Sequence, residues 1–105
     1  MQNKIYSMLG LATKAGKTVS GELPTEKAIK EEKAKLVLIA EDASDNTKKH
    51  FFDMCNYRSI PAYVFGEKDA LGHALGKGMR SSMAVVDQGF ANSIKKLLEE
   101  NKWQK

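Results

Sequence analysis

The sequence predicts an α/β fold, a three-layer α/β/α sandwich built on a four-stranded mixed sheet. The first observation is the apolar run Leu-Val-Leu-Ile-Ala over residues 36–40, which has charged residues on both sides. The run is too short to cross a membrane, and its Val and Ile content is typical of a strand covered on both faces. The second observation is the alternation of helical and strand patterns along the chain, which indicates helices on both faces of a sheet.

Length and composition bound the kind of protein. A chain of 105 residues allows a single domain over residues 1–105, of which we expect residues 101–105 to be a frayed tail. Its 42% hydrophobic and 29% charged residues are ordinary for a soluble globular protein. The net charge of +4 hints at a polyanionic partner. Because no secretory signal follows Met1 and the lone Cys55 cannot form an internal disulfide, we expect a cytoplasmic protein.

The first part of the chain predicts a helix, a short strand and a second helix. Apolar residues at helical spacing mark a helix over residues 3–15, which Gly16 can close. Residues 18–20 form a short strand candidate that ends at Gly21. Pro24 suits the first turn of the second helix, which leads into the apolar strand.

The second part of the chain continues the alternation. After the apolar strand, Asp42 or Ser44 can cap a third helix that ends near Asn56. The remaining expected elements are a strand over residues 62–65, a short helix around residues 71–75, a glycine-rich loop over residues 76–80, a strand over residues 83–86, a last helix with inward residues between 90 and 98, and a lysine-rich tail that holds Trp103.

The motifs that suggest catalysis or metal binding fail on their context. Residues 12–18 end in Gly-Lys-Thr like a phosphate-binding loop, but the first glycine is misplaced and a helix precedes the loop where a strand is required. His50 and His73 have no partner at a metal-ligand spacing, and Cys55 lies on an apolar helix face. We therefore expect no catalytic residue, no metal site and no cofactor.

The turn over residues 20–25 leads into a helix N-terminus, whose free backbone N–H groups attract phosphate. Lys14, Lys17 and Lys27 are expected to flank this turn. Taken alone, each lysine is more simply explained as a solvated surface charge than as a contact to an anion. Their convergence with a second basic turn is what favours anion binding.

That second basic turn is the loop over residues 76–80, which carries Met79 as an exposed apolar residue. If the fourth strand runs antiparallel to the second, the loop lies at the same edge as Glu41. Carboxylates there can accept from guanine N–H groups, cations can bind phosphate, and an apolar side chain can contact an unstacked base. This combination predicts recognition of an irregular RNA rather than a regular duplex.

Several ordered motifs carry a resemblance to a known family. The chain resembles, almost end to end, the kink-turn RNA-binding ribosomal proteins of the L7Ae and L30e type, and most closely their small bacterial YlxQ-like members. The motifs are Leu-Gly-Leu-Ala-Thr-Lys-Ala-Gly-Lys at residues 9–17, Ser-Gly-Glu at 20–22, the segments 34–44 and 46–49, Leu-Gly-His-Ala-Leu-Gly-Lys at 71–77, and Val-Asp-Gln-Gly-Phe-Ala at 86–91.

The resemblance implies a non-enzymatic protein that binds a kinked RNA, in which a three-nucleotide bulge abuts tandem sheared G·A pairs. The turn over residues 21–24 would reach the G·A pairs, Glu41 the bulge, and the loop over residues 76–80 a flipped-out nucleotide. The implied partner is a structured RNA, ribosomal RNA included. We expect the protein to be monomeric and to make no contact with a membrane. The RNA-binding residues expected from pattern and resemblance together are Lys14, Lys17, Gly21, Glu22, Leu23, Lys27, Glu41, Lys48, Gly76, Lys77, Gly78, Met79 and Arg80.

One departure from the family leaves an alternative open. Where archaeal members carry an Asn-Glu pair for guanine contacts, this chain has Leu23 and Pro24, neither of which donates a side-chain hydrogen bond. The alternative is a protein-interaction module that docks on a ribosomal or RNA-modifying factor, with weakened RNA binding. Of the two acids after the apolar strand, we assign Asp42 to helix capping and Glu41 to the RNA site.

Overall fold

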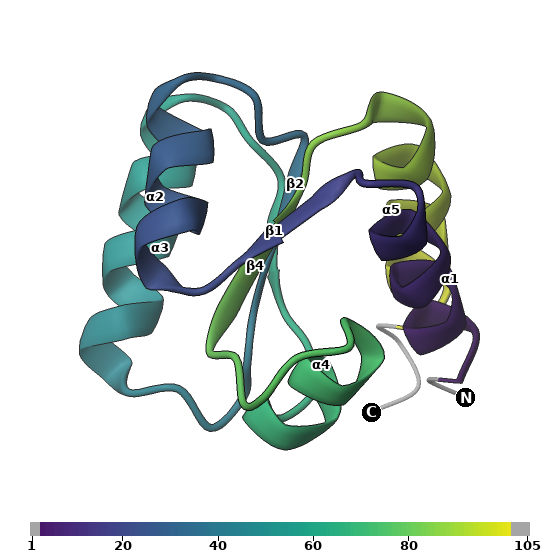
Figure 1. Ribbon diagram of the computed structural model, residues 1–105. Helices are drawn as coiled ribbons and strands as arrows, with labels where there is room; N and C mark the ends of the chain where they lie inside the picture. The colour runs from purple at the N-terminus through teal and green to yellow at the C-terminus, as the bar shows by residue number, and fades with distance from the viewer. Residues whose placement is uncertain (1–2, 102–105) are drawn as a thin grey trace.

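The computed structural model describes residues 3–101, and its centre is a four-stranded sheet (Figure 1). Residues 1–2 and 102–105 lie outside the described residues, and with them Trp103 and most of the expected tail. The strands are β1 (Thr18–Ser20), β2 (Leu36–Ile39), β3 (Ala62–Val64) and β4 (Ser82–Val85), in the spatial order β1-β4-β2-β3.

The sheet is mixed, as predicted. Strand β4 runs antiparallel to both β1 and β2, whereas β3 runs parallel to β2. Three strands therefore finish where β4 begins, and we call this side the C-terminal end of the sheet. The opposite side, where β2 and β3 begin and β4 finishes, is the N-terminal end. This arrangement meets the condition under which the loop over residues 76–80 lies beside Glu41.

Two helical layers cover the sheet, one on each face (Figure 1). Helices α1 (Asn3–Lys14), α4 (Lys68–Ala74) and α5 (Gln88–Asn101) lie on one side, and α2 (Glu22–Lys30) and α3 (Asp45–Tyr57) on the other. The α/β/α sandwich is thus confirmed. Within residues 3–101, no helix combines the length and apolar character needed to cross a membrane.

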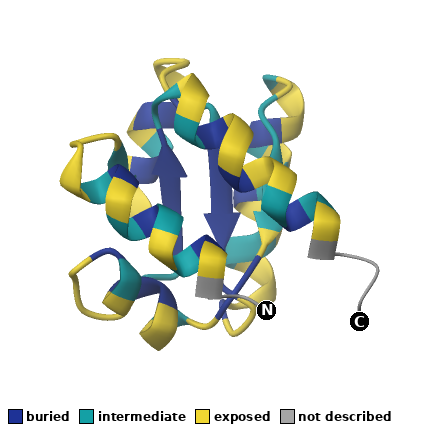
Figure 2. Ribbon diagram, turned by 90° about the vertical axis from the view of Figure 1, so that its right-hand side faces the viewer, coloured by how far each residue is buried: buried dark blue, intermediate teal, exposed yellow. Residues whose placement is uncertain are grey.

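The apolar run is buried on both faces because its side chains alternate between two cores. Leu36 and Leu38 pack with α1, α4 and α5, whereas Val37 and Ile39 pack with α2 and α3. All four side chains have no exposed surface. In Figure 2 the central strands are dark blue throughout, while the covering helices alternate between buried and exposed residues. A strand covered on both faces has no solvent-exposed side that would carry polar residues, which explains why its apolar run is unbroken.

Of the two residues that the sequence offered as the cap of α3, the structure confirms Ser44 and not Asp42. Ser44 is the N-cap, and its hydroxyl accepts from the backbone N–H of Thr47 at 3.1 Å. Asp42 stands too far before α3 to cap it, and its Oδ1 instead accepts from the backbone N–H of Lys68 at 2.9 Å, at the start of α4. The assignment of Asp42 to α3 was therefore wrong, although Asp42 does hold a helix N-terminus.

Cys55 lies in the core between the sheet and the α2–α3 layer, where it is 1% exposed. Burial raises the pKa of its thiol to about 11, and the nearby Arg58 charge offsets this only in part. The thiol is therefore protonated at neutral pH, as expected of a small core residue.

We predict that Cys55 resists modification in the native protein. A pKa shift from 9.0 to about 11 lowers the thiolate fraction at pH 8 by about 100-fold, and burial hinders access further. Native protein incubated with iodoacetamide and analysed by mass spectrometry should stay unmodified, while protein unfolded in guanidinium should be labelled fully. Native labelling at the rate of the unfolded chain would contradict the buried position.

Candidate nucleic-acid interface

Three segments that are distant in sequence meet at the C-terminal end of the sheet. They are the turn segment (residues 21–24), the acidic segment (residues 41–44) and the loop segment (residues 76–80). The backbone N–H of Gly21 donates to the carbonyl of Ser82 at 3.0 Å, which fixes the turn segment to the start of β4. The loop segment leads directly into β4, so the same strand positions both.

The turn segment forms the N-terminus of α2 without a side-chain cap. Gly21 is the N-cap residue and has φ 98°, a conformation that glycine adopts without strain. Pro24 has no N–H, so the donors that the first turn leaves unpaired within the helix are those of Glu22 and Leu23. Such donors, at the positive end of a helix dipole, suit a phosphate or a base edge.

The acidic segment divides its two carboxylates between separate tasks. Asp42 holds the start of α4, whereas Glu41 is exposed and is anchored through its backbone N–H, which donates to Gly66 O at 2.6 Å. Burial raises the pKa of the nearby Tyr6 phenol, and the Glu41 and Glu67 carboxylates raise it further. Tyr6 therefore stays neutral. The Glu41 carboxylate is a hydrogen-bond acceptor, and its backbone is fixed by the bond to Gly66 O and by the bond from the preceding Ala40 N to Ser81 O.

The loop segment packs closely on α4 because Gly72 has no side chain. A Cβ at this position would overlap the carbonyl oxygen of Gly78. The backbone N–H of Lys77 donates to Gly72 O at 2.8 Å, which ties the loop to the helix. Backbone contacts thus hold the loop, and the side chains of Lys77 and Met79 are left exposed.

Arg80 connects the loop segment with the end of β1. Its Nε donates to the Ser20 hydroxyl at 3.0 Å, and its Nη1 donates to the carbonyl of Met79 at 3.0 Å. Its backbone N–H donates to Lys68 O at 3.1 Å. Arg80 is therefore both a cation at this surface and a structural link between the loop segment and the strand that precedes the turn segment.

The structure does not bring all the predicted cations together. Lys48 lies half-buried in the first turn of α3, which starts at this end of the sheet, whereas Lys27 lies exposed in the last turn of α2. Lys14 and Lys17 lie at the opposite end, where the carbonyl of Lys17 accepts from Val86 N at 2.8 Å. The expectation that they flank the turn segment was wrong, because β1 runs across the sheet between Lys17 and Gly21.

Sequence reasoning missed the segment over residues 66–68, which follows β3 and reaches the acidic segment. Gly66 accepts from Glu41, and Lys68 donates to Asp42. Parallel strands finish at the same end of a sheet, so a parallel pairing of β2 with β3 would have indicated this contact. The sequence patterns did not specify that pairing.

The histidines take no part in a recognisable metal site. In the part of the chain that the structure describes, no group of three or more His, Cys, Asp or Glu side chains could hold a metal ion. His50 on α3 instead pairs with Glu26 on α2, with Nε2 and Oε2 2.6 Å apart. This contact links the two helices that begin at the candidate interface.

A comparison with protein families decides the classification. The model of the Ribosomal protein L7Ae/L30e/S12e/Gadd45 family matches residues 3–95. The chain belongs to this family. It is 47% identical over 94 residues to the RNA-binding protein YlxQ of Bacillus subtilis (strain 168), across 90% of this chain and 94% of that protein.

Two further relatives support the assignment. The RNA-binding protein YlxQ of Enterococcus faecium is 39% identical over 98 residues, covering 93% of this chain and 94% of that protein. The large ribosomal subunit protein eL8 of Cenarchaeum symbiosum (strain A) is 37% identical over 94 residues, covering 88% and 74% respectively. The expected resemblance to bacterial YlxQ-like members is thus confirmed.

Solved structures show the same L7Ae-type fold. A protein with unknown function from Bacillus halodurans C superposes with a TM-score of 0.88 at 36% identity, over 91% of this chain and 97% of that chain. The Giardia lamblia 15.5kD RNA binding protein gives a TM-score of 0.80 at 22% identity, over 94% and 88%. At 22% identity, the comparison with the Giardia lamblia protein shows a similarity of fold alone.

Two glycine substitutions test how the loop segment is held. We expect Gly72→Ala to lower the free energy of unfolding by about 1–3 kcal/mol, because the new methyl group must displace Gly78. The matched control is Gly10→Ala in α1, whose Cβ would lie 3.5 Å from Ala74 O, an ordinary contact. This control should be neutral or stabilising by up to about 1 kcal/mol, because alanine favours the helix.

Urea unfolding followed by circular dichroism measures both variants against the parent chain. Equal stability of the two variants would contradict the close packing of the loop segment on α4.

Proposed function

We propose that this chain is a non-enzymatic RNA-binding protein that recognises and stabilises kink-turn RNA in association with the ribosome. The observation that carries the proposal is the convergence of a free helix N-terminus, an exposed carboxylate and a basic glycine-rich loop at one end of the sheet. The relatives named RNA-binding proteins and the ribosomal relative support it. The cytoplasmic location and the monomeric state of the protein stay predictions.

The turn segment supplies contacts that need no donor on a side chain. The backbone N–H groups of Glu22 and Leu23 are available at the start of α2, and the Leu23 side chain is 76% exposed. The unpaired N–H groups can meet a phosphate or a sheared G·A pair, and Leu23 can cover an apolar surface of the RNA. Recognition at the G·A pairs then depends on shape and backbone contacts more than on side-chain hydrogen bonds.

Glu41 and Met79 supply the selectivity for the bulge. Glu41 is exposed beside the loop segment and can accept from the N1–H and N2–H groups of an unpaired guanine. Met79 is 59% exposed and can pack against a flipped-out base. A regular duplex offers neither group in this form, since its bases are stacked and paired.

The cations around these groups supply affinity without selectivity. Lys27, Lys48, Lys77 and Arg80 belong to the segments or helices that start at this end of the sheet. Each can neutralise a phosphate where the two RNA strands approach one another at the kink. A protein that binds the bent form better than the extended form raises the population of the bent form, which is how binding stabilises the kink.

The proposal is tested by gel shift with two RNAs, a kink-turn and a matched RNA whose G·A pairs are replaced by Watson–Crick pairs. We expect the kink-turn to bind at least about tenfold more tightly, because only the RNA with the G·A pairs adopts the bent form that presents its bulge together with those pairs. With four phosphates contacted, the logarithm of affinity should fall against the logarithm of salt with a slope of about 3 to 4. Equal, weak binding of both RNAs or a flat salt response would contradict the proposal.

Single substitutions separate affinity from selectivity. Lys77→Ala should weaken both RNAs about equally and lower the salt slope by about 1, because it removes one phosphate contact. Glu41→Ala should cost about 1–3 kcal/mol for the kink-turn alone, because it removes a base contact. Lys96→Ala, an exposed lysine on α5, is the matched control and should change neither RNA.

The same gel shift, titrated over protein concentration, measures these variants. If Glu41→Ala left the preference for the kink-turn intact, Glu41 would be excluded from the base contacts.

A further inference from the structure

The N-terminal end of the sheet carries a second concentration of cations, opposite the interface described above. The carbonyl of Lys17 accepts from Val86 N at 2.8 Å, and the backbone N–H of Lys35 donates to Val85 O at 2.8 Å, so both lysines flank the end of β4. Helices α1, α2 and α3 also finish at this end. The described cations here are Lys14, Lys17, Lys30, Lys33, Lys35 and Arg58, and the described carboxylates are Glu31, Glu32 and Asp87.

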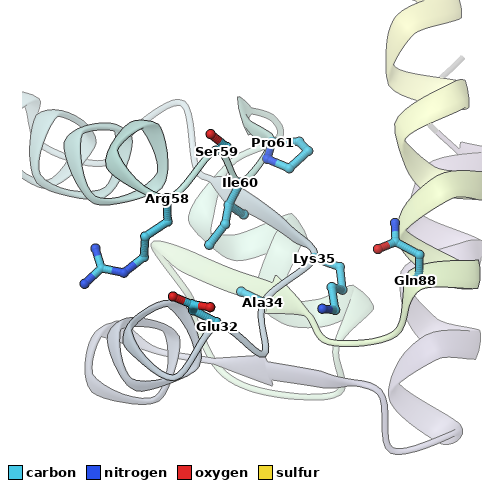
Figure 3. A pocket seen from close by; sticks show the side chains of 8 residues that line it. All are labelled: Glu32, Ala34, Lys35, Arg58, Ser59, Ile60, Pro61 and Gln88. Atoms are coloured by element: carbon cyan, nitrogen blue, oxygen red, sulfur yellow. The ribbon is translucent and has the colours of Figure 1, made fainter.

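A polar hollow of about 320 Å³ opens at this end between the segments that follow α2 and α3 (Figure 3). This volume falls in the lower part of the range typical of small-ligand sites, about 300–1,000 Å³. Figure 3 shows Glu32 and Arg58 on one side of the hollow and Lys35 and Gln88 on the other, with Ser59 above. The walls thus offer cations, an amide, a hydroxyl and a carboxylate.

An exposed aromatic ring stands next to the hollow. Tyr57, the last residue of α3, is 84% exposed, more than Leu11, Leu23, Val64 or Met79, the other exposed large apolar residues that the structure describes. The guanidinium carbon of Arg58 lies 5.3 Å from the centroid of the Tyr57 ring. Arg58 also lines the hollow, so ring and hollow form one continuous surface, which we call the Tyr57 surface.

We propose that the Tyr57 surface binds unpaired nucleotides of a single-stranded RNA. A base stacks on the Tyr57 ring, Lys35 and the neighbouring lysines neutralise the phosphates, and the hollow receives the polar edge of a nucleotide. Exposed aromatic rings beside cations are the usual means by which proteins hold single-stranded nucleic acid. A paired duplex leaves no base face open for such a ring.

The composition of the walls favours a nucleotide over a protein partner. The centres of protein interfaces are depleted of lysine and glutamate, whereas this hollow places Lys35 and Glu32 in its walls. The proposal concerns a different end of the sheet and a different RNA conformation from the kink-turn interface. It therefore goes beyond the proposed function and does not depend on it.

The test is fluorescence anisotropy with a labelled short oligouridylate and the full chain, with and without saturating unlabelled kink-turn RNA. The oligouridylate should bind in both conditions, because the two surfaces lie at opposite ends of the sheet. Tyr57→Ala should weaken this binding between about 5-fold and 150-fold, the loss expected for one stacked base. Lys35→Ala should weaken it and lower its salt dependence.

Two controls identify the surface that is occupied. Tyr57→Phe keeps the ring and should bind within about twofold of the parent chain, while Lys77→Ala on the loop segment should leave oligouridylate binding unchanged. Because Tyr57 is 84% exposed, Tyr57→Ala should fold normally, which circular dichroism checks. Its kink-turn gel shift should match that of the parent chain.

Three results would overturn the proposal. They are the absence of oligouridylate binding, an unchanged affinity in Tyr57→Ala, and a loss caused by Lys77→Ala in place of Tyr57→Ala. The second would exclude the exposed ring from RNA binding, and the third would place the oligouridylate on the kink-turn interface. Failure of the proposed function would be recognised by a different result, namely equal binding of the kink-turn and the control RNA in the gel shift without oligouridylate.

Discussion

The antiparallel pairing of β4 with both β1 and β2 is the constraint on which the candidate interface depends. Because β4 starts where β1 and β2 finish, its first residues receive the turn segment through Gly21 and the acidic segment through the bond from Ala40 N to Ser81 O at 2.9 Å. Segments some 20 residues or more apart in sequence are then placed mainly by backbone hydrogen bonds, to which the side chains of Asp42 and Arg80 add. The exposed side chains of Glu41, Lys77 and Met79 remain available for a ligand, and so they can vary without loss of the fold.

The backbone also explains why glycine marks the interface. Gly21 adopts a positive φ at the start of α2, and Gly72 lets the loop segment lie directly on α4. In both places a side chain would strain or displace the segment that faces the ligand. Asp42 adds a side-chain contact, since its carboxylate accepts from Lys68 N at the start of α4, and Lys68 O in turn accepts from Arg80 N at the end of the loop segment. The interface is thus preorganised before any RNA is present, which lowers the ordering cost of binding.

Local patterns were sufficient for the elements, and the long-range contacts were not. The run over residues 36–40 predicted a doubly covered strand, and Asp42 was expected at a helix N-terminus, although it holds α4 rather than α3. The positions of Lys14 and Lys17 were misjudged because nearness in sequence to Gly21 was taken for nearness in space. The pairing and direction of strands are tertiary properties, which a local pattern of apolar residues does not encode.

The direction of the helices accounts for part of the charge at each end of the sheet. Helices α2 and α3 begin at the C-terminal end, where their positive poles favour anions, and finish at the other end, where negative poles favour cations. Lys14, Lys30 and Arg58 stand at helix C-termini and are explained by this effect alone. The dipoles do not explain Lys35, which precedes a strand, or the exposed ring of Tyr57. A ring left in water, next to a hollow that contains a lysine no helix pole requires, is better understood as a surface for a ligand than as a requirement of the fold.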